Sequence, residues 1–146
     1  MIKYITHSPE ETIELATGIG ALLRRGDVIA FRGGLGAGKT TFTRGLAIGA
    51  GLDDEVSSPT FALINEYHGA LDIYHFDMYR IENADSLETT GFFDYPVDDS
   101  VFVIEWSENI SEFLPENTIR IEIIRTGDES REIIIEGDER FADIRY

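Results

Sequence analysis

The chain has 146 residues, close to the roughly 150 of one average domain, so we expect a single domain over residues 1–146. Its 12 lysines and arginines against 28 aspartates and glutamates give a formal net charge of −16, which disfavours a protein that itself binds RNA, DNA or an anionic membrane. The sequence has no cysteine, which excludes disulfides, a thiol nucleophile and a cysteine-ligated zinc ion.

The first elements predicted are a short strand over Ile2 to Thr6 and a helix from Pro9 to about Leu23. Ser8 has the hydroxyl that caps a helix N-terminus, and proline is favoured at the first helical position. The opening residues lack the basic and apolar regions of a signal peptide, and no apolar run approaches the roughly 18 residues of a membrane span. We therefore expect a cytoplasmic protein.

A buried strand, a glycine-rich stretch and a second helix follow in that order. Residues Val28 to Phe31 are continuously apolar, which is typical of a strand in a sheet covered on both faces. The helix predicted from Thr40 to about Ala50 is closed by Gly51. This order of elements is typical of a phosphate-binding loop.

The rest of the chain predicts two hairpins with a buried strand between them. Alternating polarity predicts two strands joined at Gly69, and the sequence TGDES predicts a second hairpin in the C-terminal part. The unbroken apolar strand between the hairpins ends in Glu105. The segments expected are strands at 61–68, 71–76, 101–104, 119–124 and 132–135 and a helix at 83–90. This pattern indicates an α/β fold with antiparallel hairpin additions.

The sequence GGLGAGKT fits the P-loop pattern and predicts where the chemistry lies. Glycines allow the backbone to wrap around phosphate oxygens with N–H groups pointing inward, and the helix N-terminus adds positive partial charge. Lys39 is expected to reach the β- and γ-phosphates, and the Thr40 hydroxyl to ligate Mg²⁺. The binding residues predicted at this loop are Gly33, Gly34, Leu35, Gly36, Ala37, Gly38, Lys39, Thr40 and Thr41.

A P-loop protein also needs a carboxylate for the metal ion, usually at the end of a second buried strand beside the first. The apolar strand that ends in Glu105 has that form, so Glu105 is the predicted Walker B acid and metal-holding residue. Asp77 is the competing candidate, because it follows the apolar run from Ile73 to Phe76.

Motifs that define other P-loop classes are absent from the sequence. It has no Asn-Lys-x-Asp element for guanine and no Asp-x-x-Gly after the P-loop, which disfavours a Ras-like GTPase. Its arginines, with Arg44 and Arg80 nearest the motifs, are few and scattered, unlike those of small-molecule kinases. The remaining interpretation is a minimal ATPase whose product is a change of shape or of partner affinity.

Three further features of the sequence each have a purely structural interpretation. The segment from Ser57 to Thr60 could sense a γ-phosphate, or it could be a polar turn in which Pro59 fixes φ. Trp106, the single tryptophan, is more often a core residue than a contact residue on general grounds. His75 is expected to be a satisfied residue within the sheet.

These residues resemble the bacterial TsaE (YjeE) family of tRNA threonylcarbamoyladenosine biosynthesis proteins. The resemblance runs from the first helix to about Pro115, and several motifs occur in the family's order and spacing. They are LGAGKTT at 35–41, SPT at 58–60, HFDMYR at 75–80, GFFDY at 91–95 and EW at 105–106. The tail after Pro115 carries little of this signal, so its hairpin is predicted from periodicity alone.

The resemblance implies a P-loop NTPase-like fold, with a mainly parallel central sheet flanked by helices, and an ATP hydrolase with ATP and Mg²⁺ as its ligands. It implies that Thr40 and Glu105 hold the metal ion. It also implies that Thr60 lies in a switch-like loop, that Asp77 lies near the attacking water or the metal, and that Trp106 lies beside the nucleotide site or the partner surface.

The resemblance further implies a protein partner. The family's ATPase works with the TsaB–TsaD pair, in which TsaD transfers the threonylcarbamoyl group to an adenosine of tRNA, and TsaE resets the complex between turnovers. The tRNA would be held only indirectly, through those subunits, which suits a strongly acidic chain; neither DNA nor a membrane is an expected partner.

Gly34 departs from the family pattern, which usually has an acidic residue at this position. Phosphate binding should persist, because the backbone provides the N–H groups, but any positioning role of that carboxylate is lost or moved to Asp77. Two alternatives to an ATPase stay open at this point: a nucleotide-gated regulatory binding subunit in which hydrolysis is not essential, and a small phosphotransferase.

Overall fold

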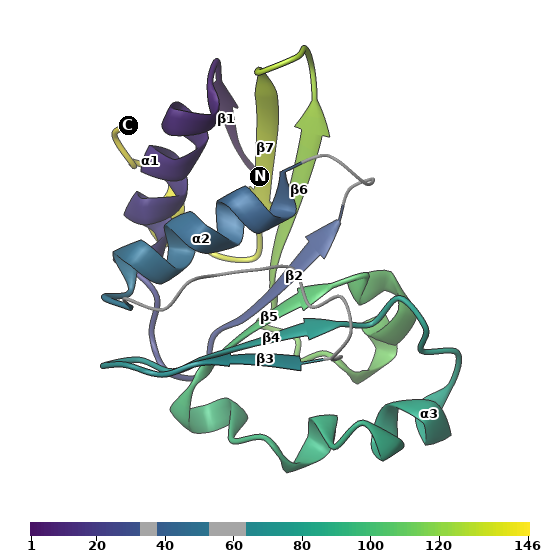
Figure 1. Cartoon of the computed structure of the whole chain (residues 1–146). Coiled ribbons are helices and arrows are strands. Elements are labelled where there is room, and N and C mark those ends of the chain that lie inside the picture. Colours follow the sequence, from purple (N-terminus) through teal and green to yellow (C-terminus); the bar gives the residue numbers. More distant parts are fainter. Residues whose placement is uncertain (33–37, 53–63) are drawn as a thin grey trace.

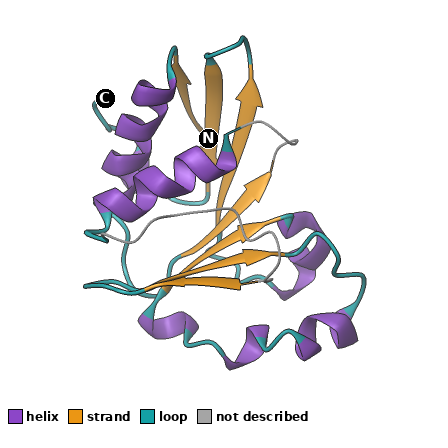
Figure 2. Cartoon of the chain, viewed as in Figure 1, coloured by secondary structure: helices purple, strands orange, loops and turns teal. Residues whose placement is uncertain are grey.

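The computed structural model describes residues 1–32, 38–52 and 64–146, which form one sheet with helices on both faces (Figure 1, Figure 2). The strands are β1 (Ile2–Thr6), β2 (Val28–Arg32), β3 (Ile64–Tyr67), β4 (Ile73–Asp77), β5 (Val101–Glu105), β6 (Ile119–Arg125) and β7 (Arg131–Glu136). The α-helices are α1 (Pro9–Gly20), α2 (Lys39–Gly49) and α3 (Ala84–Thr89), and the 3-10 helices are η1 (Phe92–Asp94), η2 (Val97–Asp99), η3 (Ser107–Phe113) and η4 (Glu139–Phe141). None of the described helices is long and apolar enough to cross a membrane.

The seven-stranded sheet has the order β1-β7-β6-β2-β5-β4-β3. Its four central strands, β6, β2, β5 and β4, are parallel to one another, whereas β3 pairs antiparallel with β4, and β7 and β1 pair antiparallel at the other edge. This confirms the expected α/β fold with a mainly parallel centre and hairpin additions. Because β2 and β5 are parallel neighbours, both end at the same edge of the sheet, where α2 begins.

The N-terminal elements agree with the sequence prediction except at the end of the first helix. The Ser8 hydroxyl caps α1 by accepting a 3.1 Å hydrogen bond from the backbone N–H of Glu11. Helix α1 ends at Gly20 rather than near Leu23, because the N–H groups of Leu22 and Leu23 donate to carbonyls three residues back, the spacing of a tighter 3-10 turn. Leu23 is nevertheless buried, which accounts for its place in the apolar pattern.

Both predicted hairpins are present. Strands β3 and β4 pair with Tyr67 opposite Ile73, and strands β6 and β7 pair with Arg125 opposite Arg131. The first strand of the chain, β1, lies beside the last, β7, with Ile2 opposite Ile135 (Figure 1). The C-terminal hairpin therefore joins the N-terminal strand to the central parallel strands.

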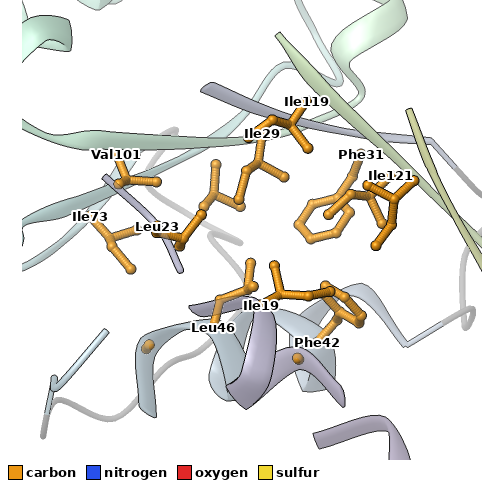
Figure 3. Close-up of a cluster of buried hydrophobic side chains, with 14 of the residues drawn as sticks. Ile19, Leu23, Ile29, Phe31, Phe42, Leu46, Ile73, Val101, Ile119 and Ile121 are labelled. Atoms are coloured by element: carbon orange, nitrogen blue, oxygen red, sulfur yellow. The ribbon is translucent and has the colours of Figure 1, made fainter. Parts of the chain in front are cut away.

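Helices α1 and α2 cover one face of the sheet and bury the larger hydrophobic core. Figure 3 shows side chains of both helices pointing toward apolar side chains of the strands. The labelled residues are Ile19, Leu23, Ile29, Phe31, Phe42, Leu46, Ile73, Val101, Ile119 and Ile121. The rings of Phe31 and Phe42 meet edge to face at 5.8 Å, which ties the first turn of α2 to the end of β2.

The two helices approach each other closely because small residues line their contact. A Cβ atom at Gly20 would lie 2.2 Å from the carbonyl oxygen of Leu46, and one at Gly45 would lie 2.5 Å from Cβ of Ala16. Neither position has room for a larger side chain without a shift of the helices. The glycines therefore fix how close α2, and with it Lys39, lies to the rest of the molecule.

The opposite face of β2, β5 and β4 is covered by the segment that includes α3, η1, η2 and η3. Its core is largely aromatic: the ring of Phe76 contacts those of Phe92, Tyr95 and Phe102. Such offset and edge-to-face pairs add stabilisation beyond the area that they bury. The central strands are thus buried on both faces, as their unbroken apolar sequences predict.

Candidate functional site

The predicted phosphate-binding loop connects the end of β2 to the start of α2, as a P-loop requires. Gly33, Gly34, Leu35, Gly36 and Ala37 lie outside the described residues. Gly38 is described and has φ of 100°, a left-handed conformation that L side chains rarely adopt. Its carbonyl oxygen accepts the 2.9 Å hydrogen bond from the N–H of Phe42 that opens α2.

The start of α2 differs from the starts of the other two α-helices. Ser8 caps α1 with its hydroxyl, and Asn83 caps α3 through a capping box with Ser86. Helix α2 begins after Gly38, which has no side chain that could accept from the helix N–H groups. The first turn of a helix has N–H groups without intrahelical acceptors, so a bound anion could take the place of the cap.

The sequence segment around this loop has a net charge opposite in sign to that of the whole chain. Between Val28 and Leu52 the sequence contains no aspartate or glutamate, although it contains Arg32, Lys39 and Arg44. Between residues 81 and 119, by contrast, there are ten acidic residues and no lysine or arginine. The loop therefore lies in a stretch of the sequence without acidic residues, although Glu105 lies 3.9 Å from Lys39 in the fold.

Lys39 and Glu105 meet at the edge where β2 and β5 end. Lys39 Nζ lies 3.9 Å from Oε1 of Glu105, and 8% of each side chain is exposed. Two unit charges about 4 Å apart attract by about 4 kcal/mol at an effective dielectric constant of 20. Removing each ion from water costs several kcal/mol, so the pair adds little net stability. Buried charges that folding does not require are typical of functional sites.

His75 is a partner of Glu105 that the sequence did not identify. His75 Nε2 lies 2.8 Å from Oε2 of Glu105, and the histidine side chain is fully buried. The register of β4 and β5 pairs His75 with Val103, so His75 and Glu105 lie diagonally on the same face of neighbouring strands. The signal available in the sequence was a histidine two positions before Asp77 at the end of an apolar strand.

Asp77 lies beside Glu105, since the two residues are register partners at the ends of β4 and β5. Its side chain is half-buried, and Oδ1 accepts a 3.0 Å hydrogen bond from the backbone N–H of Tyr79. The remaining oxygen can serve a ligand or water. Both predicted carboxylates therefore lie on the face covered by α1 and α2, the same face as Lys39.

Trp106 follows Glu105 and lies against the lysine. Lys39 Nζ is 5.3 Å from the centroid of its ring, within cation–π range, and the ring of Tyr79 lies 4.9 Å away on centroids. Trp106 has φ of 58°, the left-handed region, in which a bulky residue is an outlier. The buried Ser107 hydroxyl donates a 3.0 Å hydrogen bond to the carbonyl oxygen of Phe31 and fixes this turn on the end of β2.

Thr40 and Thr41 lie in the first turn of α2, and both are half-buried. Thr41 and Gly38 line a cavity of about 60 Å³ that is bounded by the start of α1 and by the β6–β7 turn. The lining residues are Pro9, Thr12, Gly38, Thr41, Glu129 and Arg131. This cavity adjoins the N-terminus of α2 through Gly38 and Thr41. The segment from Ser57 to Thr60 lies outside the described residues.

The residues available for a metal ion fit magnesium rather than a transition metal. Within the described ranges no group of three or more histidines, aspartates and glutamates could hold an ion by themselves. Magnesium is usually held by one or two carboxylates together with substrate phosphates and water. A hydroxyl at Thr40 and a carboxylate at Glu105 fit that donor set.

Arg44 and Arg80 are exposed, which agrees with solvated positions. A larger cavity of about 150 Å³ lies on the opposite face of the sheet, where its lining is apolar and aromatic, including Phe92, Phe93 and Phe113. Its lining has no charged side chain that could bind a phosphate.

Comparisons with known proteins identify relatives of the chain and of its fold. The family model described as threonylcarbamoyl adenosine biosynthesis protein TsaE matches residues 6–133, which includes the C-terminal hairpin as far as β7. The tRNA threonylcarbamoyladenosine biosynthesis protein TsaE of Bacillus subtilis (strain 168) is 45% identical over 133 residues, covering 90% of this chain and 83% of the relative. The tRNA threonylcarbamoyladenosine biosynthesis protein TsaE of Treponema pallidum (strain Nichols) is 38% identical over 134 residues. The match covers 92% of this chain and 99% of the relative. The crystal structure of Bacillus subtilis YdiB matches with a TM-score of 0.76 and 39% identity, covering 96% of this chain and 88% of that chain.

Proposed function

Since the chain belongs to the TsaE family of tRNA threonylcarbamoyladenosine biosynthesis proteins, we propose that it is a magnesium-dependent ATPase that acts on a TsaB–TsaD complex. The observation that carries the proposal is the buried approach of Lys39 to Glu105, 3.9 Å apart at the common edge of β2 and β5. This pairing brings together the two charges that a P-loop ATPase uses for phosphate and metal.

ATP is the proposed ligand, with its phosphates at the N-terminus of α2. Lys39 would exchange part of its contact with Glu105 for the β- and γ-phosphates, and N–H groups of the first helical turn would donate to phosphate oxygens. Residues 33–38 provide the glycine-rich backbone for the same purpose. The cavity between Thr12 and Thr41 is our proposed surroundings for the nucleoside part.

Thr40 and Glu105 are the proposed holders of Mg²⁺. The ion would supply neutralisation of phosphate charge during transfer to water. Glu105 is held from two sides, by Lys39 and His75, so its carboxylate is oriented before a ligand arrives. Asp77 is the proposed residue that positions the attacking water, because Gly34 has no carboxylate to do so, and Thr60 is proposed to sense the γ-phosphate.

The proposed role of hydrolysis is to reset the TsaB–TsaD complex between rounds of tRNA modification. The net charge of −16 supports an indirect relation to tRNA, since the chain as a whole repels a polyanion. Trp106 and the 60%-exposed Tyr79 lie beside the proposed phosphate position, where a bound partner could sense the state of the nucleotide.

Glu105→Gln distinguishes the ATPase from a nucleotide-gated binding subunit. We expect this variant to bind ATP with little change but to hydrolyse it at least about 100-fold more slowly, because the amide is a poor ligand for the metal ion. The assay is multiple-turnover modification of tRNA by the TsaB–TsaD pair of the same organism, with the chain added, omitted or replaced by the variant. Sustained turnover with the variant would favour the binding subunit, and Glu116→Gln, an exposed glutamate after η3, is the matched control.

A phosphotransferase is the second alternative, and γ-labelled ATP separates it from the ATPase. The proposed ATPase releases all of the label as free phosphate. Stable label on the chain, on TsaB, on TsaD or on a small molecule would favour the phosphotransferase.

A further inference from the structure

We propose that His75 is a positioning residue that fixes the orientation of the Glu105 carboxylate. Its ring N–H holds Oε2, which leaves Oε1 facing Lys39 and the proposed metal position. The inference rests on the proposed function, because it assigns His75 a role toward a residue of the proposed magnesium site.

The proposal places a ring proton of His75 on Nε2. Nε2 lies 2.8 Å from Oε2 of Glu105, a hydrogen-bond distance, and a carboxylate oxygen is an acceptor, so we assign the donor to Nε2. Both groups are buried, at 0% and 8% exposure, so no solvent competes strongly for the bond. This bond is therefore strong enough to restrict rotation of the carboxylate.

Packing alone does not account for a histidine here. Nδ1 of His75 is buried and has no hydrogen-bond partner in the described part of the chain. A buried polar atom without a partner destabilises the folded state, and an apolar side chain of similar size would fill the same place without this cost. The ring also packs near Tyr67, 6.4 Å away on centroids, a contact that an apolar side chain would keep. The distinct contribution of His75 is thus the N–H that it offers to Glu105.

As a consequence, the two carboxylate oxygens of Glu105 face different partners, Oε2 facing His75 and Oε1 facing Lys39. Without the His75 donor, the carboxylate could rotate and present either oxygen, or both, to Lys39. With Oε2 held, Oε1 keeps one direction, toward the lysine and the end of β2. Partners of this kind that orient a metal-binding group change metal affinity or activity by roughly 10- to 100-fold when they are removed.

The first test uses the protein without nucleotide or metal, so it does not depend on activity. Long-range nitrogen–proton NMR of the imidazoles of the wild-type chain, with His75 assigned by comparison with His75→Gln, should show His75 protonated at Nε2 and unprotonated at Nδ1. A ring protonated at Nδ1 instead, or one that exchanges between tautomers, would overturn the proposal.

The second test measures the Mg²⁺ concentration that half-saturates ATP binding and hydrolysis, with Trp106 fluorescence as the binding signal. For His75→Leu we expect this concentration to rise at least 10-fold, while the affinity for ADP in EDTA changes less than twofold. His75→Gln, which can again place an N–H near Oε2, should recover most of the loss. His68→Leu, an exposed histidine, controls for loss of an imidazole, and Ile73→Val controls for loosening of β4.

A double-mutant cycle separates positioning from a general structural effect. If His75 acts through Glu105, then His75→Leu should add little to the magnesium requirement of Glu105→Gln. Equal losses in both backgrounds, or an unchanged requirement in His75→Leu, would overturn the proposal. If His75→Leu does not fold, the NMR signature and His75→Gln decide in its place. Absence of magnesium-dependent ATP binding by the wild-type chain would instead contradict the proposed function itself, and the NMR result would still report on the bond.

Discussion

The Lys39 ammonium lies 3.9 Å from the Glu105 carboxylate, at the edge where two parallel strands of the central sheet end. The residues come from separate parts of the chain, the start of α2 and the end of β5. Their contact means that any substitution of the lysine acts both on ligand binding and on a buried carboxylate. Measurements of stability therefore belong beside each binding measurement.

Lys39→Ala should weaken ATP binding by roughly 10- to 100-fold, because a hydrogen bond to a charged group contributes about 1.5–3 kcal/mol and 1.4 kcal/mol is tenfold. Isothermal titration calorimetry with ATP and Mg²⁺ measures this loss. The other lysine of the chain, the exposed Lys3, provides the control Lys3→Ala. Undiminished ATP affinity in a folded Lys39→Ala protein would contradict the P-loop assignment.

Thr40→Ala should increase the Mg²⁺ concentration needed for ATP binding, while ADP binding in EDTA stays nearly unchanged. The reason is that the hydroxyl is a proposed metal ligand and makes no proposed contact with the base. Thr17→Ala removes a threonine hydroxyl from α1, where it donates to the carbonyl oxygen of Ile13, and serves as the control. The same magnesium requirement in Thr40→Ala and wild type would exclude Thr40 as a ligand.

Ser107→Ala should lower the free energy of unfolding by about 1 kcal/mol, because it removes a buried hydrogen bond to the carbonyl oxygen of Phe31. For a domain of this size the melting temperature should fall by about 3 °C. Chemical and thermal denaturation measure the change, and Ser111→Ala, at an exposed position, should be near neutral. Equal stability of the two variants would show that the hydrogen bond does not hold the turn after β5.

Asp138→Asn should destabilise the protein by up to about 1 kcal/mol at neutral pH, because the amide can still cap the helix but loses the charge that pairs with Arg140 Nε at 3.0 Å. The backbone N–H of Arg140 donates to Asp138 at 2.9 Å and lowers the pKa of that carboxyl below its ordinary value of 3.8, and burial of the carboxyl opposes this shift. A lowered pKa stabilises the fold above the pKa of the unfolded chain, and this stabilisation is lost as the pH falls through the pKa of the folded state. The difference in the free energy of unfolding between the variant and the wild type should therefore shrink below about pH 3.8. Chemical denaturation at pH 7 and at pH 3 measures this difference. The same difference at both pH values would contradict the assigned role of the charge.

Most of the fold could be predicted because its signals are local. The cap at Ser8, the turn at Gly69 and the apolar run before Glu105 each occupy a few consecutive residues, and each gave the right kind of element. The apolar pattern predicts the end of α1 too late, since Leu23 continues that pattern although its N–H already bonds in a tighter turn.

Apart from the two hairpins, the sequence does not predict which strands pair or in which register they do so. Pairing of β1 with β7 joins segments about 130 residues apart, and no local pattern specifies it. The bond between His75 and Glu105 likewise depends on the register of β4 against β5, which becomes visible only when the strands are aligned. The left-handed backbone of Trp106 has no sequence signal either, because residues of this kind rarely adopt it.

The most direct test of the account is an experimental crystal structure of the chain with a non-hydrolysable ATP analogue and Mn²⁺ in place of Mg²⁺, with the metal located by its anomalous scattering. We expect phosphates at the N-terminus of α2 in contact with Lys39, and one metal peak about 2.1 Å from the Thr40 hydroxyl and within one water of the Glu105 carboxylate. A nucleotide bound elsewhere, or a metal ion that contacts neither residue, would contradict it.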